Sequence, residues 1–551
     1  MATTSISGIS SGIDWQSTID LLMQIEQQSV TRLEERKAEY QAKNSAWSSI
    51  QSKLNALKNA AQKIDTQNEV LKKSASSSDT DVFTASAEAG AVSGSHAIIV
   101  NQLAQAEVYV HSDGWSDINS SSIYTGSGGQ FAYNFDGQNI IVDVPTGSTL
   151  LDLVQLINND DDNQDEDGNP LIVASTIDDG GDTDPIHLVL TAVNPTAANS
   201  FSIDDVNTNL GSGAEFDDAS WTRTQDAQVS QIRVDGYPPA GWITRESNVI
   251  DDVLEGVTLT LKDTTASAVN VSVENNYSEI KQRITDWVNA YNQVMTEITT
   301  DTRYDSENEV RGILMGDSQV RTVRDELVDI VVSQIQGLPE NASYLSLGDI
   351  GIDLSSNSTL TIDESELQEA LEADAEAVAN LFAKSTSTTD SSLQFLSYTK
   401  DTEGGSYEVE AAWLSSGYLD SSGTNTIGGY PATIESKTIL VGQEGTPVEG
   451  MRIQFTYPGG GAGTTTATVR FGAGVGVQSD SAVKTMTDSI DGLIKNVTDS
   501  YSTQISNLDE SIEAYEARME IKREMLESKF IAMESLMAQA QTQSSWISAM
   551  G

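Results

Sequence analysis

The sequence of 551 residues contains no cysteine, which excludes disulfide bonds and thiolate metal sites. It has only three histidines, His96, His111 and His187, and they do not have the spacing of zinc ligands. No apolar run approaches the roughly 18 residues that a membrane-spanning helix needs, so we expect no membrane insertion. The first seven residues lack lysine and arginine, and Asp14 and Asp20 interrupt the apolar stretch that follows. We therefore expect no cleavable secretory signal.

Positive charge is also scarce: 30 lysine and arginine residues stand against 82 aspartate and glutamate residues, and the formal net charge is -52. A polyanion would be repelled at long range, so we expect no binding to nucleic acid. The excess of acid lies between residues 76 and 480, whereas the two ends are close to balance. Such a surface keeps copies of a protein apart except where they are meant to touch, and adaptation to a saline habitat explains it equally well.

The N-terminal part of the chain has helical periodicity over some fifty residues, and no proline interrupts it. Apolar residues recur there at spacings of 3 and 4, which is the heptad pattern of a coiled coil or a long bundle helix. The predicted seam holds Trp15, Ile19, Leu22, Leu33, Tyr40, Trp47, Leu54 and Ala61, with Arg36, Lys43, Ile50, Leu57 and Ile64 at its second position.

The C-terminal part repeats this pattern, and we expect the two terminal helices to bury their stripes against each other. The middle of the chain then becomes one long insertion, and basic residues in both seams favour a fixed register. The stripe is predicted to begin upstream, at Val483, Met486, Ile490, Leu493 and Val497. The C-terminal seam holds Ile505, Ile512, Met519, Leu526, Met533 and Ala540, with Leu508, Tyr515, Lys522, Lys529 and Leu536 at its second position.

Between the ends, the apolar period changes to two in several places, which indicates β-strands. A strand and turn pattern over 131–159 ends in a short amphipathic helix over 150–157, and 231–261 indicates strand, turn, short helix and strand. A helical block follows from 277, with Asp317 and Asp363 as N-cap candidates, and Trp47, Trp287 and Tyr291 on apolar faces that predict core packing. Residues 384–393 indicate a Ser/Thr linker before a further β segment.

The length suggests about three to five domains, and the pattern predicts an α+β multidomain fold. In this fold a discontinuous helical stem or coiled coil from both chain termini joins a central helical block, and antiparallel β-rich domains are inserted into it. The predicted division is a terminal coiled-coil leg of 1–45 with 505–551, a helical stem of 46–94 with 272–397 and 477–504, a β-rich head of 95–130 with 225–271, an inserted β-rich module of 131–224, and an additional β-rich insertion of 398–476.

The acidic run over 160–169 is the best metal candidate. Asn163, Asp165, Asp167 and Gly168 match the first half of a calcium loop, but Ala174 stands where the bidentate glutamate should be. A solvated loop is therefore favoured, and we predict no metal or other cofactor. Carboxylates are abundant, yet no ordered motif pairs them with histidine, cysteine or lysine, and no nucleophile elbow or phosphate loop is present. The sequence therefore does not indicate an enzyme.

Several segments resemble, in order, those of the bacterial flagellar filament cap family, also called hook-associated protein 2. They are "GISSGIDWQSTIDLLMQIE", "IIVNQLAQAE", "TLLDLVQLIN", "VDGYPPAGWITRESNVIDDVLEGVTLTL", "WVNAYNQVM", "GILMGDSQVR", "LGDIGI", "LTIDESEL" and "FIAMESLMAQAQTQSSWI". The resemblance covers most of the chain. One departure is the β segment near 400–476, which is larger than in the most familiar caps.

The resemblance implies a non-enzymatic machine at the extracellular tip of the filament, exported unfolded through the flagellar type III channel without cleavage. It implies a ring of copies, most often a pentamer, that helps flagellin fold and insert. Further implied partners are the hook-filament junction protein and a dedicated export chaperone. The residues expected to make coiled-coil, oligomer or filament contacts are Trp15, Ile19, Leu22, Leu33, Tyr40, Trp47, Leu508, Ile512, Tyr515, Met519, Leu526, Met533 and Leu536.

Two rival functions fit the same sequence features. The first is a flagellin or hook-filament junction protein, which shares helical termini of this kind but polymerises into a tube instead of stopping at a closed ring. The second is a secreted adhesin whose β modules bind glycan or mucin, a role that can coexist with capping.

Overall fold

The computed structural model describes residues 14–550 except 121, 136, 166–167, 194–200, 211–215 and 307, with the side chains of 548–550 also left out. The chain divides into two compact units. The first unit contains both ends of the chain, up to Leu71 and from Tyr277 onward, and the second contains Lys72–Asn276. The part of the predicted N-terminal signature that precedes Asp14 lies outside the described residues. Within the described chain, no helix combines the length and apolarity needed to cross a membrane.

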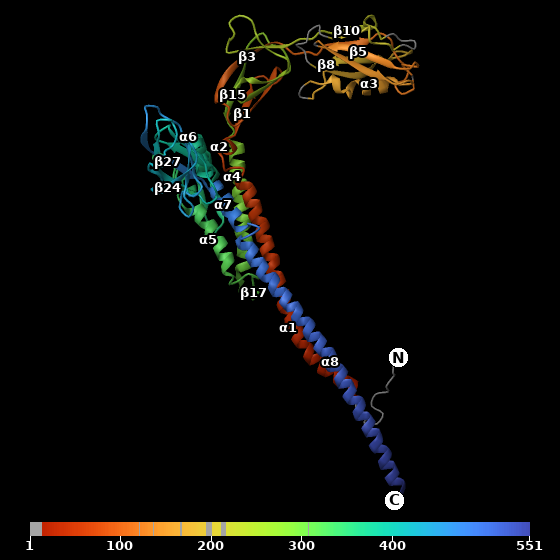
Figure 1. Cartoon of the computed structure of the whole chain (residues 1–551), viewed down its shortest axis with the longest axis vertical. Helices are drawn as coiled ribbons and strands as arrows, with labels where there is room; N and C mark the ends of the chain where they lie inside the picture. Colours follow the sequence, from red (N-terminus) through yellow and green to blue (C-terminus); the bar gives the residue numbers. More distant parts are fainter. Residues whose placement is uncertain are drawn as a thin grey trace. The chain divides into compact units, whose positions relative to one another are not determined.

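Two long helices dominate the first unit, α1 (Trp15–Ala61) and α8 (Leu493–Met550). Neither contains proline or glycine, and Asp14 starts α1 by accepting a hydrogen bond from the Ser17 backbone N–H at 3.1 Å. The two helices pack along each other, as Figure 1 shows, so the predicted pairing of the terminal helices is confirmed.

The C-terminal part of α1 also belongs to a helical bundle, whose core contains Trp47, Trp287, Tyr291 and Phe382 with exposed fractions of 1% or less. The predicted core packing of Trp47, Trp287 and Tyr291 is therefore confirmed, and the rings of Trp287 and Phe382 meet edge to face at 6.0 Å. Asp317 and Asp363 cap their helices as predicted. The bundle contains α2 (Gln67–Val70), α4 (Tyr277–Thr302), α5 (Ser318–Val332), α6 (Glu364–Phe382), α7 (Val475–Met486), η3 (Leu347–Ile350) and two hairpins, β16 (Tyr304–Asp305) with β17 (Val310–Arg311) and β18 (Ile352–Leu354) with β19 (Leu360–Ile362).

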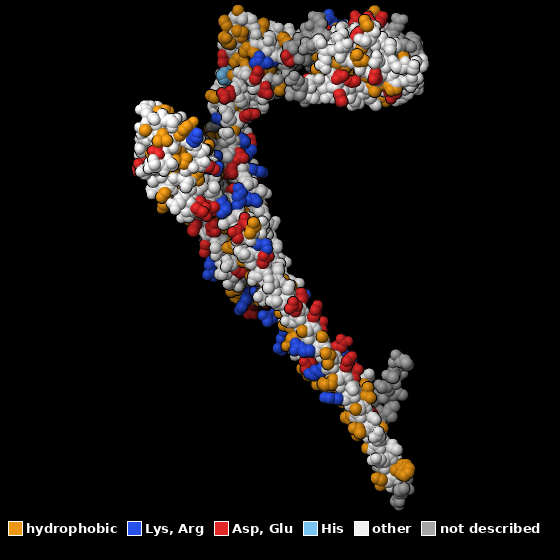
Figure 2. All heavy atoms as spheres, in the orientation of Figure 1, with side chains coloured by type: hydrophobic (Ala, Val, Ile, Leu, Met, Phe, Trp, Pro, Cys, Tyr) orange, Lys and Arg blue, Asp and Glu red, His pale blue; other side chains and the backbone are white. Residues whose placement is uncertain are grey.

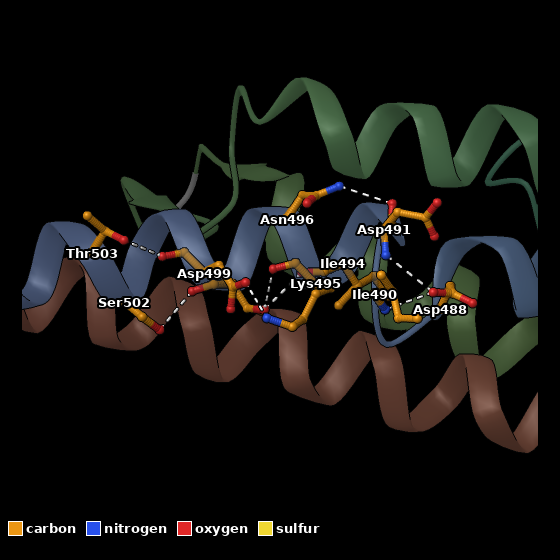
Figure 3. A network of polar contacts seen from close by, with 10 residues as sticks. Asp488, Ile490, Asp491, Ile494, Lys495, Asn496, Asp499, Ser502 and Thr503 are labelled. Carbon is orange, nitrogen blue, oxygen red and sulfur yellow. Dashed lines mark hydrogen bonds and ion pairs between the residues drawn. The ribbon is translucent and has the colours of Figure 1, made fainter.

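The predicted continuous stripe between Val483 and Val497 is wrong, because α7 ends at Met486 and α8 begins at Leu493. In the turn between them, Asp488 accepts hydrogen bonds from the backbone N–H groups of Ile490 and Asp491 at 2.8 and 3.2 Å (Figure 3). Ile490 is 85% exposed. A Cβ at Gly492 would lie 2.5 Å from the Asp488 carbonyl oxygen, so this tight turn requires glycine.

An eight-stranded antiparallel sheet completes the first unit. Its order is β20-β27-β22-β23-β24-β25-β26-β21, and it encloses its own apolar core. The predicted linker over 384–393 is wrong, since Lys384 starts β20 and pairs with Ala473. Serine and threonine fill β20, so it carries no apolar alternation to reveal the strand. The strands are β20 (Lys384–Thr388), β21 (Leu393–Ser397), β22 (Gly405–Trp413), β23 (Asn425–Ile427), β24 (Tyr430–Ser436), β25 (Ile439–Gly442), β26 (Arg452–Phe455) and β27 (Gly463–Ala473).

The second unit begins with two sheets around one apolar core, ordered β1-β15-β3-β11-β12 and β13-β14-β2. The predicted short helix within 231–261 is wrong, because Ile250 lies in strand β13 opposite Leu259; a short apolar run fits either structure. Residues 72–94, predicted to belong to the stem, lie in this second unit, where β1 pairs with β15 and β2 pairs with β14. The strands are β1 (Lys73–Ser77), β2 (Phe83–Ala87), β3 (Gly94–Gln102), β11 (Ser230–Val234), β12 (Ile243–Arg245), β13 (Val249–Leu254), β14 (Val257–Leu261) and β15 (Val269–Asn275).

The remainder of the second unit has a separate core between two further sheets, ordered β10-β4-β8-β7 and β6-β5-β9. The predicted short helix is confirmed as α3 (Leu150–Asn158), which begins with a capping box between Thr149 and Asp152. The other elements are β4 (Val108–His111), β5 (Gly129–Phe135), β6 (Gln138–Val144), η1 (Asp161–Asn163), β7 (Ile172–Asp178), β8 (Ile186–Ala192), β9 (Ser202–Ile203), η2 (Asp218–Ser220) and β10 (Trp221–Gln225).

Candidate functional site

The far part of the α1–α8 pair, meaning the N-terminal part of α1 and the C-terminal part of α8 that extend beyond the bundle, has its own small apolar cluster. Trp15 and Ile19 are buried there, and the Trp15 ring stacks on Phe530 with centroids 6.1 Å apart and planes 14° apart. Met519 and Leu526 pack against the same cluster. Four residues that the sequence predicted for the seam are therefore brought together by segments some five hundred residues apart.

Charged pairs flank this apolar cluster and join the two helices. The Arg523 guanidinium lies 3.0 Å from the Asp20 carboxylate, and Lys522 pairs with Glu26. Further along, Lys37 pairs with Asp509. Exposed pairs of this kind contribute about 0–1 kcal/mol each, so we infer that they set the register of the helices more than they stabilise the contact.

The predicted heptad frame is wrong at several seam positions. Met23 is 8% exposed and takes the place assigned to Leu22, which is 42% exposed, and Val30 is fully buried. From Trp15 the stripe passes through Ile19, Met23 and the half-buried Glu26, so it begins with steps of 4, 4 and 3, an eleven-residue spacing that a strict heptad misses. Phe530 lies in the seam in place of its neighbour Lys529. Of the other predicted seam residues, the buried ones are Leu508 and Trp47, and the half-buried ones are Leu33, Tyr40, Lys43, Ile512 and Met533. The exposed ones are Arg36, Tyr515, Lys522, Lys529 and Leu536.

Lysine substitutions at two neighbouring positions test which residue lies in the seam. Met23→Lys should destabilise the far part of the helix pair by about 2 kcal/mol, because it removes a buried side chain from the seam. Leu22→Lys is the matched control and should leave the pair intact. Amide hydrogen exchange over residues 15–30 should accelerate for Met23→Lys alone. Faster exchange for Leu22→Lys instead would restore the heptad frame.

Large apolar side chains remain exposed on both helices of the pair, outside the seam. Figure 2 shows hydrophobic side chains gathered along its far end. Many large apolar side chains exposed on one part of a protein indicate a site of interaction with another protein. The exposed residues are Leu21, Leu22 and Ile25 on α1 and Tyr515, Ile521, Met525, Ile531, Leu536, Met537, Trp546 and Ile547 on α8.

Where the pair enters the bundle, Asp317 joins three helices. One of its carboxylate oxygens accepts hydrogen bonds from Trp47 Nε1 at 3.3 Å and from the Tyr501 hydroxyl at 2.9 Å, and the other caps α5 at the Gln319 N–H. Burial and the Asp317 carboxylate raise the pKa of Tyr501 to about 12, so its hydroxyl stays a donor at neutral pH.

Asp317→Ala should therefore destabilise the first unit by about 2–3 kcal/mol. The substitution removes an N-cap and leaves the Trp47 and Tyr501 donors without this acceptor. Chemical denaturation followed by tryptophan fluorescence measures the change. Asp325→Ala on the exposed side of α5 is the control, and an equal midpoint shift in both variants would contradict the role of Asp317.

A group of carboxyl groups lies where the turn after α1 meets α7 and the sheet. The Asp65 side chain hydrogen-bonds Glu69 and faces Asp480 and Lys484, while its backbone carbonyl accepts from the Lys384 N–H at 2.9 Å. Asp480 is itself held by Gln62 Nε2 at 2.9 Å and by Lys484. Burial, and then the neighbouring carboxyl groups, raise the pKa of Asp65 from 3.8 to about 7.

This raised pKa predicts a pH-dependent stability. Below pH 4 Asp65 is protonated in both the folded and the unfolded chain. Between pH 4 and 7 the unfolded chain releases the proton first, so the free energy of unfolding falls as pH rises. Asp65→Asn should remove this dependence and be more stable than the parent at pH 8. Denaturant midpoints at pH 5 and 8 test this. An equal change of midpoint between the two pH values in the parent and in Asp65→Asn would refute it.

The candidate calcium loop is held by hydrogen bonds within the protein. Asn163 donates to the carbonyl oxygens of Ile157 and Ile172 and accepts from the Ile172 N–H at 3.0 Å, and Asp165 accepts from the Asn169 N–H at 2.8 Å. Asp167 lies outside the described residues. Among those described, no group of three or more acidic or histidine side chains is placed to bind a metal ion.

Comparison with protein families finds two matches that together span most of the chain. The model for the flagellar hook-associated protein 2 C-terminus matches residues 227–542, and that for the N-terminus of the same protein matches residues 11–107. The larger match alone covers more than half of the sequence.

Individual relatives agree. The chain is 26% identical to the flagellar hook-associated protein 2 of Campylobacter jejuni, over 78% of this chain and 70% of that protein. It is 26% identical to that of Escherichia coli K12, over 69% and 80%, and 26% identical to the lateral protein of Vibrio parahaemolyticus, over 54% and 65%. A crystal structure of the Escherichia coli flagellar cap protein FliD aligns with a TM-score of 0.47 at 26% identity, covering 61% of this chain and 89% of that one.

Proposed function

The chain belongs to the flagellar hook-associated protein 2 family, the structural and non-enzymatic caps of the bacterial flagellar filament, and from this membership we propose how its parts perform capping. It acts outside the cell, at the flagellum. We propose that several copies, most simply five, form a ring at the filament tip that promotes the insertion of flagellin and prevents its loss.

The observation that carries the proposal is the exposed apolar surface on the far part of α1 and α8. A single copy leaves side chains such as Leu21, Ile25 and Trp546 more than half exposed. Long helices of this kind need partners, which the uppermost filament subunits and neighbouring copies would supply.

Two groups of predicted contact residues then have different roles. Trp15, Ile19, Met519 and Leu526 would hold the pair together from within, whereas Leu22, Tyr515 and Leu536 lie on the surface that would touch the filament or a neighbouring copy. The proposed division into leg, stem, head, inserted module and additional sheet module has three changes from the predicted bounds. Strands β1 and β2 belong to the head, β4 to the inserted module, and β20 and β21 to the additional sheet module. The hook-filament junction protein and an export chaperone are the further partners in this proposal.

Complementation of a cap-deficient flagellated cell tests the function. The full chain should restore swimming and reduce the amount of unpolymerised flagellin in the medium, because a capped tip retains exported subunits. The empty expression vector is the control. Continued leakage of flagellin, despite export of the chain at normal levels, would contradict the proposal.

A further inference from the structure

A cationic cavity lies beside the start of α5, in the first unit. Its volume is about 690 Å³, and four of its lining side chains are basic in a chain that has only 30 basic residues. Its two acidic side chains are Glu39, which pairs with Lys43 at 2.7 Å, and Asp317, whose carboxylate accepts hydrogen bonds from Trp47 and Tyr501, so basic side chains outnumber acidic ones in the lining. The charged lining residues are Glu39, Lys43, Arg311, Asp317, Arg321 and Arg324.

The three arginines of this cavity have few carboxylate partners. Within the described chain, no carboxylate lies within ion-pair distance of Arg311 or Arg321, and both residues are exposed. Arg324 pairs only with its sequence neighbour Asp325, at 2.7 Å. The half-exposed Met315 adds apolar surface to the lining. The cavity therefore suits a carboxylate-bearing segment of another protein surface.

A second cavity, of about 630 Å³, shares Asp317 with the first and has the opposite charge. Its lining includes Asp317 and Asp491 and no basic residue. Asp488 lies next to Asp491, as Figure 3 shows, and the backbone N–H groups of Ile490 and Asp491 lower the pKa of its carboxyl group, which keeps it ionised. We call the corner formed by Asp488 and Asp491 the acidic corner.

The two cavities lie on opposite flanks of α5. Gln319 lines the acidic cavity and Arg321 the cationic one. Residues two positions apart on an α-helix are rotated by about 200° about its axis, so the side chains of Gln319 and Arg321 leave α5 in nearly opposite directions. Because both cavities include Asp317, they lie at the same level of the stem.

We propose that the cationic cavity of one copy receives the acidic corner of a second copy. This contact rests on the ring assembly proposed above and names a surface that builds it. Copies that each carry a net charge of -52 repel one another, so a stable contact between them needs local charge complementarity. A contact between two different patches on opposite flanks repeats from copy to copy and closes into a ring when the rotation allows.

Charge exchange at one residue from each flank tests the proposal on the full chain. Arg321→Glu and Asp491→Arg should each raise the protein concentration needed for assembly by about tenfold or more, in sedimentation velocity at 0.1 M salt or below. The double variant carries both changes in every copy, so its flanks are complementary again, and it should assemble close to the parent. Assembly of the parent should also weaken as salt rises.

Matched controls are Lys437→Glu and Glu444→Arg, which reverse exposed charges in the turns at the two ends of β25 and should leave assembly unchanged. Thermal unfolding confirms that each variant is folded. If the parent assembles and Arg321→Glu assembles equally well, the cavity contact is overturned while the ring proposal stands. A parent that stays monomeric at every concentration overturns both. Normal assembly of Arg321→Glu with weakened binding to purified filament subunits would overturn the contact between copies and place the cavity at the filament.

Discussion

Deletion of residues 1–45 together with 505–551 should abolish filament capping while leaving the rest of the chain folded. Every buried residue of the bundle core lies between Trp47 and Ile494, and its partly buried neighbours extend only from Ala46 to Tyr501. The apolar cluster around Trp15 and Phe530 lies wholly within the deleted segments. The deletion therefore removes the leg with its exposed apolar surface and spares the cores of both units.

Circular dichroism, thermal unfolding and swimming assays measure this outcome. The truncated protein should keep cooperative unfolding and its strand content, lose helix content in proportion to the deleted segments, and give no swimming in cap-deficient cells. The full chain, produced at the same level, is the control. Normal swimming with the truncated protein would show that capping does not depend on the terminal helix pair.

Trp47→Ala should destabilise the first unit by about 3–5 kcal/mol, the range for removing a large aromatic side chain from a packed core. Trp47 is completely buried in the bundle, and its Nε1 donates to Asp317 at 3.3 Å. The substitution thus creates a cavity and removes one of the hydrogen bonds that join α1 to the start of α5.

Trp546→Ala is the matched control, because Trp546 is 68% exposed near the end of α8. Its free energy of unfolding should stay within about 0.5 kcal/mol of the parent, while its capping activity should fall if the exposed apolar surface binds the filament. Denaturation midpoints of the two variants measure the contrast. Equal destabilisation by both substitutions would contradict the distinction between core and contact surface.

The sequence alone predicts the pairing of the terminal helices, the α3 helix and both aspartate caps. These succeed because each leaves a local signal: a long stripe, a short amphipathic period, or an aspartate just before an apolar helix. The burial of Trp287 and Tyr291 in the bundle core follows from the same periodicity.

The errors arise where the deciding interaction is non-local. Met23 and Leu22 are both apolar, and only the position of α8 decides which one is buried. Strand β20 is a run of serine and threonine whose partner, β27, lies about eighty residues away. The cationic cavity is assembled from α1, α4, β17 with the loop that follows it, and α5, so no single segment of sequence could reveal it.

The most direct test of the capping account is to add the labelled full chain to purified filaments that lack a cap and to locate the label by electron microscopy. The account predicts one compact assembly at the distal end of each filament and none along its sides. It also predicts that the deletion of 1–45 with 505–551 leaves the ends bare. Label distributed along the filament sides, or equal labelling of the ends by the truncated chain, would contradict it.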